Sequence, residues 1–145
     1  MPGKEFSFLA GEVEVTVPDQ KNGKKVKPKK VQKDSISKLK GKSGKFQPHR
    51  IVMNVVLVDD ADKLMGSFDP PVELRFRYNA SDLKEAEKAG KKLALAFWDE
   101  KAMDWVVFTK AKHQFNMVPD SNKKSGVAVV KISKWADPNV GWGRI

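Results

Sequence analysis

Polar and apolar residues alternate along several short segments of this chain, and this pattern constrains the fold more than any other feature. In Glu12–Val17 the valines alternate with glutamate and threonine, and Pro18 ends the run. Val72–Tyr78 alternates in the same way after Pro70-Pro71. A period of two places every second side chain on the same face of a β-strand. Each segment therefore predicts a strand with one buried face and one exposed face.

Other segments predict further strands and one helix. Ile51–Val58 is apolar on both faces, which is typical of a strand in the middle of a sheet. Leu93–Trp98 and Trp105–Thr109 flank a short polar turn and predict a hairpin. Ser81–Gly90 has a serine as its predicted cap, early acidic residues and a terminal glycine, so it predicts a short helix. The remaining strand candidates are Phe6–Phe8 as the partner of Glu12–Val17, His113–Val118 and Val127–Ile132.

These segments together favour one mainly β domain. A length of 145 residues suits a single domain, residues 1–145. Seven or eight short antiparallel strands with one crossover helix favour a β-sandwich over a barrel. Alternation also predicts that Trp98 points away from the core or lies at its strand's end. The side chains predicted to enter the core are Val72, Leu74, Phe76 and Tyr78 from one strand and Leu93, Leu95 and Phe97 from another.

The positive charge is concentrated in one part of the chain. Residues 21–50 hold 12 of the 28 Lys and Arg residues and one of the 18 acidic residues, so they carry a net charge of +11. The other 115 residues then carry −1, and the total is +10. This part is rich in Gly, Pro and Ser and poor in bulky apolar side chains. A chain that buries little apolar surface does not offset its ordering entropy. We therefore expect residues 19–48 to form a flexible loop, and residues 136–145, with their Gly and Pro, to form an irregular tail.

A dense run of lysines has two interpretations. It can act as an electrostatic arm for a polyanion, which means a nucleic acid, an anionic glycan or an anionic membrane surface. It can also be a solubilising loop without a partner. Lysine lacks the bidentate geometry of arginine, so binding would have little sequence preference. Phe46 is the one aromatic residue in this region that could stack on a base. The candidate polyanion-binding residues are Lys24, Lys25, Lys27, Lys29, Lys30, Lys38, Lys40, Lys42 and Lys45.

Part of the sequence resembles ZU5-like and related bacterial β-sandwich domains. The similarity lies in the Gly-to-Pro strand Gly11–Pro18, in Pro71–Tyr78 followed by Asp82-Leu83, and in Leu95–Asp99 followed by Trp105. The Lys-rich part and the C-terminal end depart from that pattern. The resemblance implies a non-catalytic module that makes protein contacts or builds larger surface or scaffold proteins. A shared fold does not by itself fix a function.

The residues that could carry chemistry are few. The chain has no Cys and two His, which leaves no thiolate metal site and no Cys nucleophile. Neither His lies in a nucleophile motif, so a small hydrolase is the least favoured function. Asp59, Asp60 and Asp62, with Asp69 as a further oxygen donor, form either a calcium loop or an acidic turn. Their spacing does not match an EF-hand. We expect no enzyme activity and no cofactor.

The tryptophans offer an alternative binding surface. Trp98, Trp105 and Trp142 could contact a carbohydrate or a protein if their rings were exposed, or they could close the hydrophobic ends of the domain. The start of the chain shows no apolar signal-peptide core, and no run approaches the roughly 18 apolar residues of a membrane span. We therefore expect a cytoplasmic location by default, although the sequence does not identify the compartment. The leading hypothesis is a non-enzymatic binding or assembly module whose lysines bind polyanions.

Overall fold

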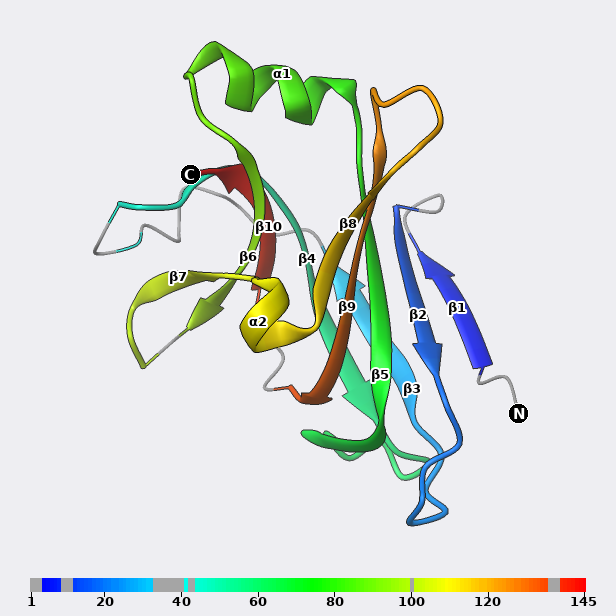
Figure 1. Ribbon diagram of the computed structural model, residues 1–145. Helices are drawn as coiled ribbons and strands as arrows, with labels where there is room; N and C mark the ends of the chain where they lie inside the picture. Colours follow the sequence, from blue (N-terminus) through cyan, green and yellow to red (C-terminus); the bar gives the residue numbers. More distant parts are fainter. Residues whose placement is uncertain (1–3, 9–11, 33–40, 42–43, 100, 136–138) are drawn as a thin grey trace.

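The computed structural model describes residues 4–8, 12–32, 41, 44–99, 101–135 and 139–145. Over these residues the protein is mainly β, with ten strands in two five-stranded antiparallel sheets and two helices (Figure 1). The alternating segments of the sequence form strands because each can bury one face while its backbone is paired within a sheet.

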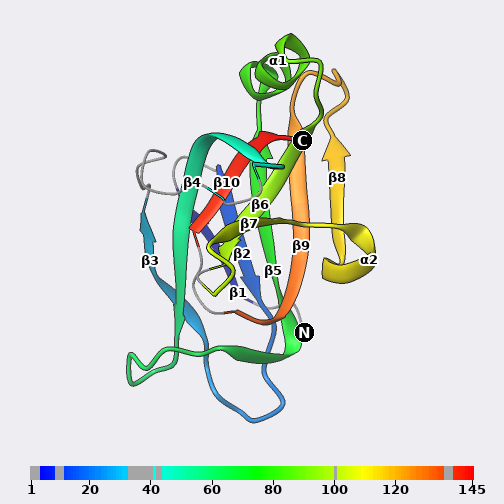
Figure 2. The same cartoon turned by 90° about the vertical axis from the view of Figure 1, so that its left-hand side faces the viewer.

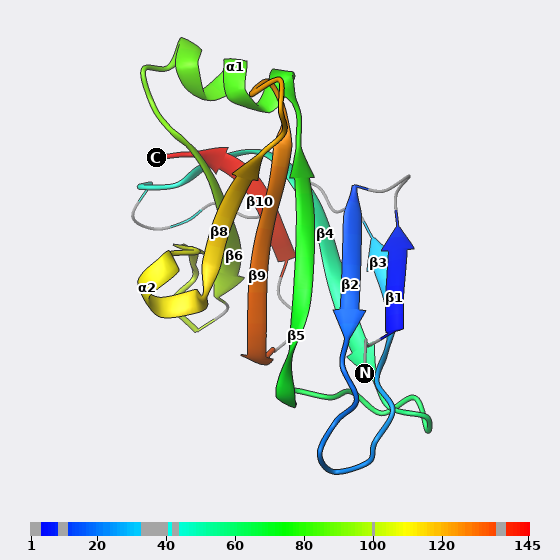
Figure 3. The same cartoon turned by 45° about the vertical axis from the view of Figure 1, so that its right-hand side comes forward.

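The first sheet contains the predicted pairing of Phe6–Phe8 with Glu12–Val17, as strands β1 and β2. Its β1–β2 hairpin has Phe6 opposite Val15, and β2 pairs with β5 through Val15 and Leu74. Figure 3 shows this sheet with β1 at one edge and β8 at the other. Its order is β1 (Lys4–Phe8), β2 (Val13–Val17), β5 (Ser67–Tyr78), β9 (Gly126–Lys134) and β8 (Phe115–Pro119).

The second sheet combines expected and unexpected strands (Figure 2). The predicted hairpin β6–β7 is confirmed, with Trp98 opposite Trp105. The predicted central position of Ile51–Val58 is also confirmed, because β4 lies between β3 and β10. The order of the sheet is β3 (Lys27–Gln32), β4 (Gln47–Val58), β10 (Asn139–Arg144), β6 (Leu93–Asp99) and β7 (Asp104–Val107).

Two of these strands correct the sequence interpretation. β3 lies inside residues 19–48, which were expected to be a flexible loop, and β10 lies inside the tail 136–145, which was expected to be irregular. β3 escaped detection because Lys27–Gln32 has almost no apolar residue, and a strand at a sheet edge can be polar. In β10 the glycines at 141 and 143 hide the alternation of Val140 and Trp142, although both of these side chains are fully buried.

The predicted helix is present, but its cap is a different residue. α1 (Ala80–Lys88) begins after Asn79, whose side chain accepts a hydrogen bond from the Asp82 backbone N–H. The Asp82 carboxylate in turn accepts from the Asn79 N–H, which completes a capping box. Ser81, which was expected to cap the helix, is exposed within it. Gly90 has a φ of 66° and stops the helix, as predicted.

A second helix, α2 (Lys110–His113), is too short to produce a periodic pattern in the sequence. It lies between β7 and β8 and is capped by the Thr109 side chain, which accepts from the Lys112 N–H. It carries the chain from the second sheet to the first.

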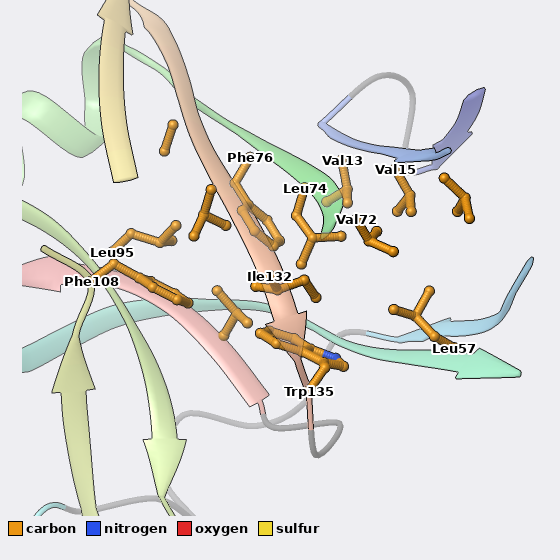
Figure 4. Close-up of a cluster of buried hydrophobic side chains, with 14 of the residues drawn as sticks. Val13, Val15, Leu57, Val72, Leu74, Phe76, Leu95, Phe108, Ile132 and Trp135 are labelled. Carbon is orange, nitrogen blue, oxygen red and sulfur yellow. The ribbon is translucent and has the colours of Figure 1, made fainter. Parts of the chain in front are cut away.

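One hydrophobic cluster takes side chains from both sheets (Figure 4). Val72, Leu74 and Phe76 of β5 are fully buried in it, and Tyr78 is 4% exposed, which confirms the predicted inner face of this strand. The second sheet contributes Leu95, which is also fully buried, while Leu93 and Phe97 pack against the cluster from partly buried positions. The other members from the second sheet are Leu57, Val140 and Trp142.

Candidate polyanion-binding segment

The candidate lysines fall into three groups in the structure. Lys24, Lys25, Lys27 and Lys45 are exposed. Lys29 and Lys30 lie in β3, for which the backbone path is given. Lys38, Lys40 and Lys42 lie outside the described residues. We use the name Lys-rich segment for residues 21–45, which contain all of these positions.

Two buried apolar residues attach the Lys-rich segment to the domain, one near its start and one just after its end. Val26 is 5% exposed and belongs to the main core. Phe46 directly follows the segment, is 4% exposed and packs against Trp105 with ring centroids 5.3 Å apart. Phe46 belongs to a separate cluster with Ala94, Ala96, Trp98 and Trp105. The segment is therefore attached to the domain through buried side chains near its start and just after its end.

β3 gives some of the lysines a structural explanation. Among the strands that the structure describes, it is an edge strand of the second sheet and pairs with β4 alone. Its register shifts between Pro28 and Lys30, so Lys29 is the extra residue of an irregularity. Proteins protect edge strands from pairing with other chains by placing lysine, proline and bulges there. Lys27, Lys29 and Lys30 are consistent with that role.

A buried glutamine holds the start of the segment in place. Gln20 is 8% exposed, and its side-chain amide donates to the carbonyls of Pro18 and Pro70, both at 3.0 Å. Its side-chain oxygen accepts from the Asp69 N–H at 2.8 Å. The Lys21 N–H then donates to the Asp69 carbonyl at 2.9 Å. Gln20 could not be recognised as a structural residue from the sequence, because one glutamine in a polar stretch has no distinguishing pattern.

Acidic residues of the β4–β5 connection and of the start of β5 lie beside the first lysines of the segment. The Lys27 ammonium is 3.9 Å from an Asp62 carboxylate oxygen, and the Lys21 ammonium is 3.5 Å from Asp69. All four side chains are at least half exposed. The pKa of Asp59 lies below its ordinary value mainly because its carboxylate accepts a hydrogen bond from the Lys63 N–H. A hydrogen bond from Ala61 and the charge of Lys24 act in the same direction.

The same geometry bears on the calcium interpretation of Asp59, Asp60 and Asp62. The Asp59 carboxylate accepts hydrogen bonds from the backbone N–H groups of Ala61 and Lys63, which is the pattern of an Asx turn. Over the described part of the chain, no three His, Cys, Asp or Glu side chains are arranged to hold a metal ion. The hydrogen bonds observed for the Asp59 carboxylate are those of an acidic turn.

The three candidate tryptophans are buried. Trp142 is fully buried and meets Tyr78 edge to face at 5.4 Å. Trp98 and Trp105 are 5% and 6% exposed and pack edge to face at 5.5 Å on the outer side of the second sheet. Trp98 thus points away from the main core, as its alternation with Phe97 predicted, but other residues cover it. Of the two interpretations of these rings, their burial favours the one in which they close hydrophobic parts of the domain.

His113 is engaged in a structural contact. Its ring lies edge to face with Phe97 and Phe108, at 5.8 and 5.5 Å. Its Nδ1 accepts a hydrogen bond from the Thr109 N–H at 3.0 Å. Burial lowers the pKa of His113, and the charge of Lys112 adds to the effect. The Nδ1 atom of His113 is therefore the acceptor for the backbone N–H of the residue that caps α2. The side chain of His49 lies outside the described residues.

Comparisons with known proteins add no relative. No family model matches the chain, and neither a curated protein nor a solved structure matches it. Among the described residues, no helix has the length and apolar character needed to cross a membrane.

Proposed function

We propose that this protein is a non-enzymatic binding module in which a β-sandwich presents the Lys-rich segment to polyanions. The observation that carries the proposal is the placement of the charge. A net charge of +11 occupies residues 21–50, and the segment within them is attached to the domain through Val26 and Phe46. The sandwich part of the proposal is supported by the two antiparallel sheets that share one core.

The chemistry of lysine defines the partner. Ammonium groups displace the counterions of a polyanion, so affinity depends steeply on salt. Because Lys24, Lys25 and Lys45 are exposed, their charges are accessible to a large anion. Lysine does not form the paired hydrogen bonds by which arginine recognises a base or a phosphate, so the proposed binding has little sequence preference. The ZU5-like resemblance also favours a module without catalysis.

The buried rings favour recognition by charge alone. Phe46, Trp98 and Trp105 are each at most 6% exposed, so they do not form a platform for stacked bases. We therefore expect the partner to be recognised through its phosphate or sulfate groups. This expectation separates the protein from single-strand binders, which combine a basic groove with exposed aromatic side chains.

The experiment removes charge while it keeps the fold. Deleting residues 21–46 would also remove β3, Val26 and Phe46, so substitution is the cleaner test. The variant is Lys24→Gln, Lys25→Gln, Lys29→Gln and Lys30→Gln, which combines two exposed lysines with two lysines of β3. The matched control is Lys84→Gln, Lys88→Gln, Lys91→Gln and Lys92→Gln, which removes equal charge from exposed positions in and just after α1. Anisotropy of labelled duplex DNA and heparin is measured over a salt series.

The two variants should behave differently. We expect the slope of log Kd against log salt to fall in the segment variant by about 0.9 for each lost phosphate contact, and to stay unchanged in the control. Equal loss of affinity in both variants would show that only net charge matters. Absence of binding by the native protein at low salt would reject the proposal.

A second candidate function rests on β3. The lysines and Pro28 at this edge favour a structural or assembly module whose basic residues prevent unwanted strand pairing. In that case the segment variant would keep its weak polyanion binding and would self-associate, which size-exclusion chromatography measures. The adhesive alternative that used exposed tryptophans has lost its structural support, because those rings are buried.

A further inference from the structure

Strand pairing fixes the acidic β4–β5 connection beside the start of the Lys-rich segment. Lys27 is the register partner of Val58, which directly precedes Asp59. At the start of β5, the Lys21 N–H donates a hydrogen bond to the Asp69 carbonyl, and the Asp69 N–H donates to the Gln20 side-chain oxygen. The backbone therefore brings these acidic and basic residues into the same part of the molecule.

We propose that Asp59, Asp62 and Asp69 act as an internal competitor that occupies Lys21, Lys24 and Lys27 until a polyanion displaces it. The inference rests on the proposed function and adds a regulatory contact to it. Two of the pairs are direct, Lys21 with Asp69 at 3.5 Å and Lys27 with Asp62 at 3.9 Å. Asp59 directly follows Val58, the register partner of Lys27, and the charge of Lys24 is one of the causes that lower the pKa of Asp59.

These ion pairs are exposed to solvent, so a polyanion can replace the carboxylates as the partner of the lysines. The side chains of Lys21 and Asp69 are 75% and 70% exposed, so water and salt screen their attraction. A polyanion brings many charges at once and releases its own counterions, and it can therefore displace single carboxylates. The result is a lower apparent affinity, because a polyanion must displace the carboxylates before it binds these lysines.

The turn allows a conservative test. Asp59→Asn keeps a side-chain oxygen that can accept from the Ala61 and Lys63 N–H groups. Asp62 has a φ of 60°, and asparagine tolerates this left-handed conformation well. The double variant Asp59→Asn and Asp62→Asn should therefore fold normally. Glu85→Gln and Glu87→Gln in α1 make the matched control, with the same change in net charge.

Binding to heparin and to duplex DNA at low salt decides the question. We expect the loop variant to bind about twofold to fivefold more tightly than the control, because each exposed ion pair is weak. The gain should disappear when Lys24→Gln and Lys27→Gln are added. If the loop variant and the control gained equal affinity, the competitor proposal would be wrong. Binding of the polyanion by the native protein would still support the proposed function in that case. If neither native protein nor loop variant bound a polyanion, both proposals would fail.

Discussion

Phe46 lies directly beyond the Lys-rich segment and packs its ring against Trp105, with the centroids 5.3 Å apart and the planes inclined by 48°. Trp105 in turn meets Trp98 edge to face at 5.5 Å. These rings cover the outer side of the second sheet over β6 and β7, where Ala94 and Ala96 leave room for them. The most basic part of the chain is therefore tied to the domain by an aromatic contact.

Phe46→Ala should remove this attachment. Truncation of a buried phenylalanine costs about 3–5 kcal/mol, so we expect a clear loss of unfolding free energy in urea. Trp98 and Trp105 should also become accessible to water, which shifts tryptophan emission to longer wavelength in the folded protein. Leu64→Ala is the control, because Leu64 is 68% exposed and its loss should change neither quantity. An unchanged urea midpoint for Phe46→Ala would contradict the contact.

Much of the fold follows from patterns that the sequence displays. The alternation of Val72–Tyr78 correctly predicted which side chains enter the core, because this strand has one clearly apolar face. β10 was missed because a buried strand can use glycine where neighbouring backbone comes close. A Cβ on Gly143 would lie 2.8 Å from the Pro48 Cα. In α1, Asn79 and Ser81 are both acceptable caps, and only the hydrogen bonds distinguish them.

The candidate site was less predictable than the fold. The charge of the lysines is visible in the sequence, and the anchoring role of Val26 and Phe46 is not. The approach of Lys27 to Asp62 depends on the pairing of β3 with β4. Because β3 lacks an apolar pattern, sequence reasoning could not place these charges together. Long-range pairing of polar segments leaves little trace in local periodicity.

Gln20→Met should show how much the buried amide contributes to the fold. Methionine has a similar length but cannot form the three hydrogen bonds that Gln20 makes with Pro18, Asp69 and Pro70. Leaving buried backbone groups without partners costs about 1–3 kcal/mol, so the unfolding free energy should fall by that order. Urea denaturation followed by circular dichroism measures the loss. Stability equal to the native protein would mean that water replaces these bonds.

Gly126→Ala should strain the contact between β5 and the start of β9. A Cβ at this position would collide with the Tyr78 hydroxyl and lie 2.6 Å from both the Tyr78 Cζ and the Val118 carbonyl oxygen. Tyr78 is 4% exposed and the second obstacle is backbone, so neither moves easily. Overpacking of this kind costs about 1–3 kcal/mol. Thermal denaturation should show a lower Tm than for Gly66→Ala, whose Cβ would have only one neighbour, at 3.3 Å.

His113 should make the stability of the fold fall as the pH decreases from neutral. Burial lowers the pKa of His113 in the folded protein, whereas the unfolded chain titrates near the ordinary value of about 6.5. Between the folded and unfolded pKa values the unfolded chain binds more protons, so the unfolding free energy decreases as the pH falls through this window. Protonation of Nδ1 would also remove the acceptor for the Thr109 N–H.

His113→Asn isolates this effect, because the amide oxygen can still accept from Thr109 and does not titrate. Urea midpoints are compared between pH 7.5 and pH 5, above the range in which the lowered pKa of Asp120 matters. His49 contributes equally to both proteins, so the difference in their pH dependence belongs to His113. We expect the native protein to lose more stability than the variant over this range. Parallel pH profiles would show that His113 titrates alike in the folded and unfolded chains.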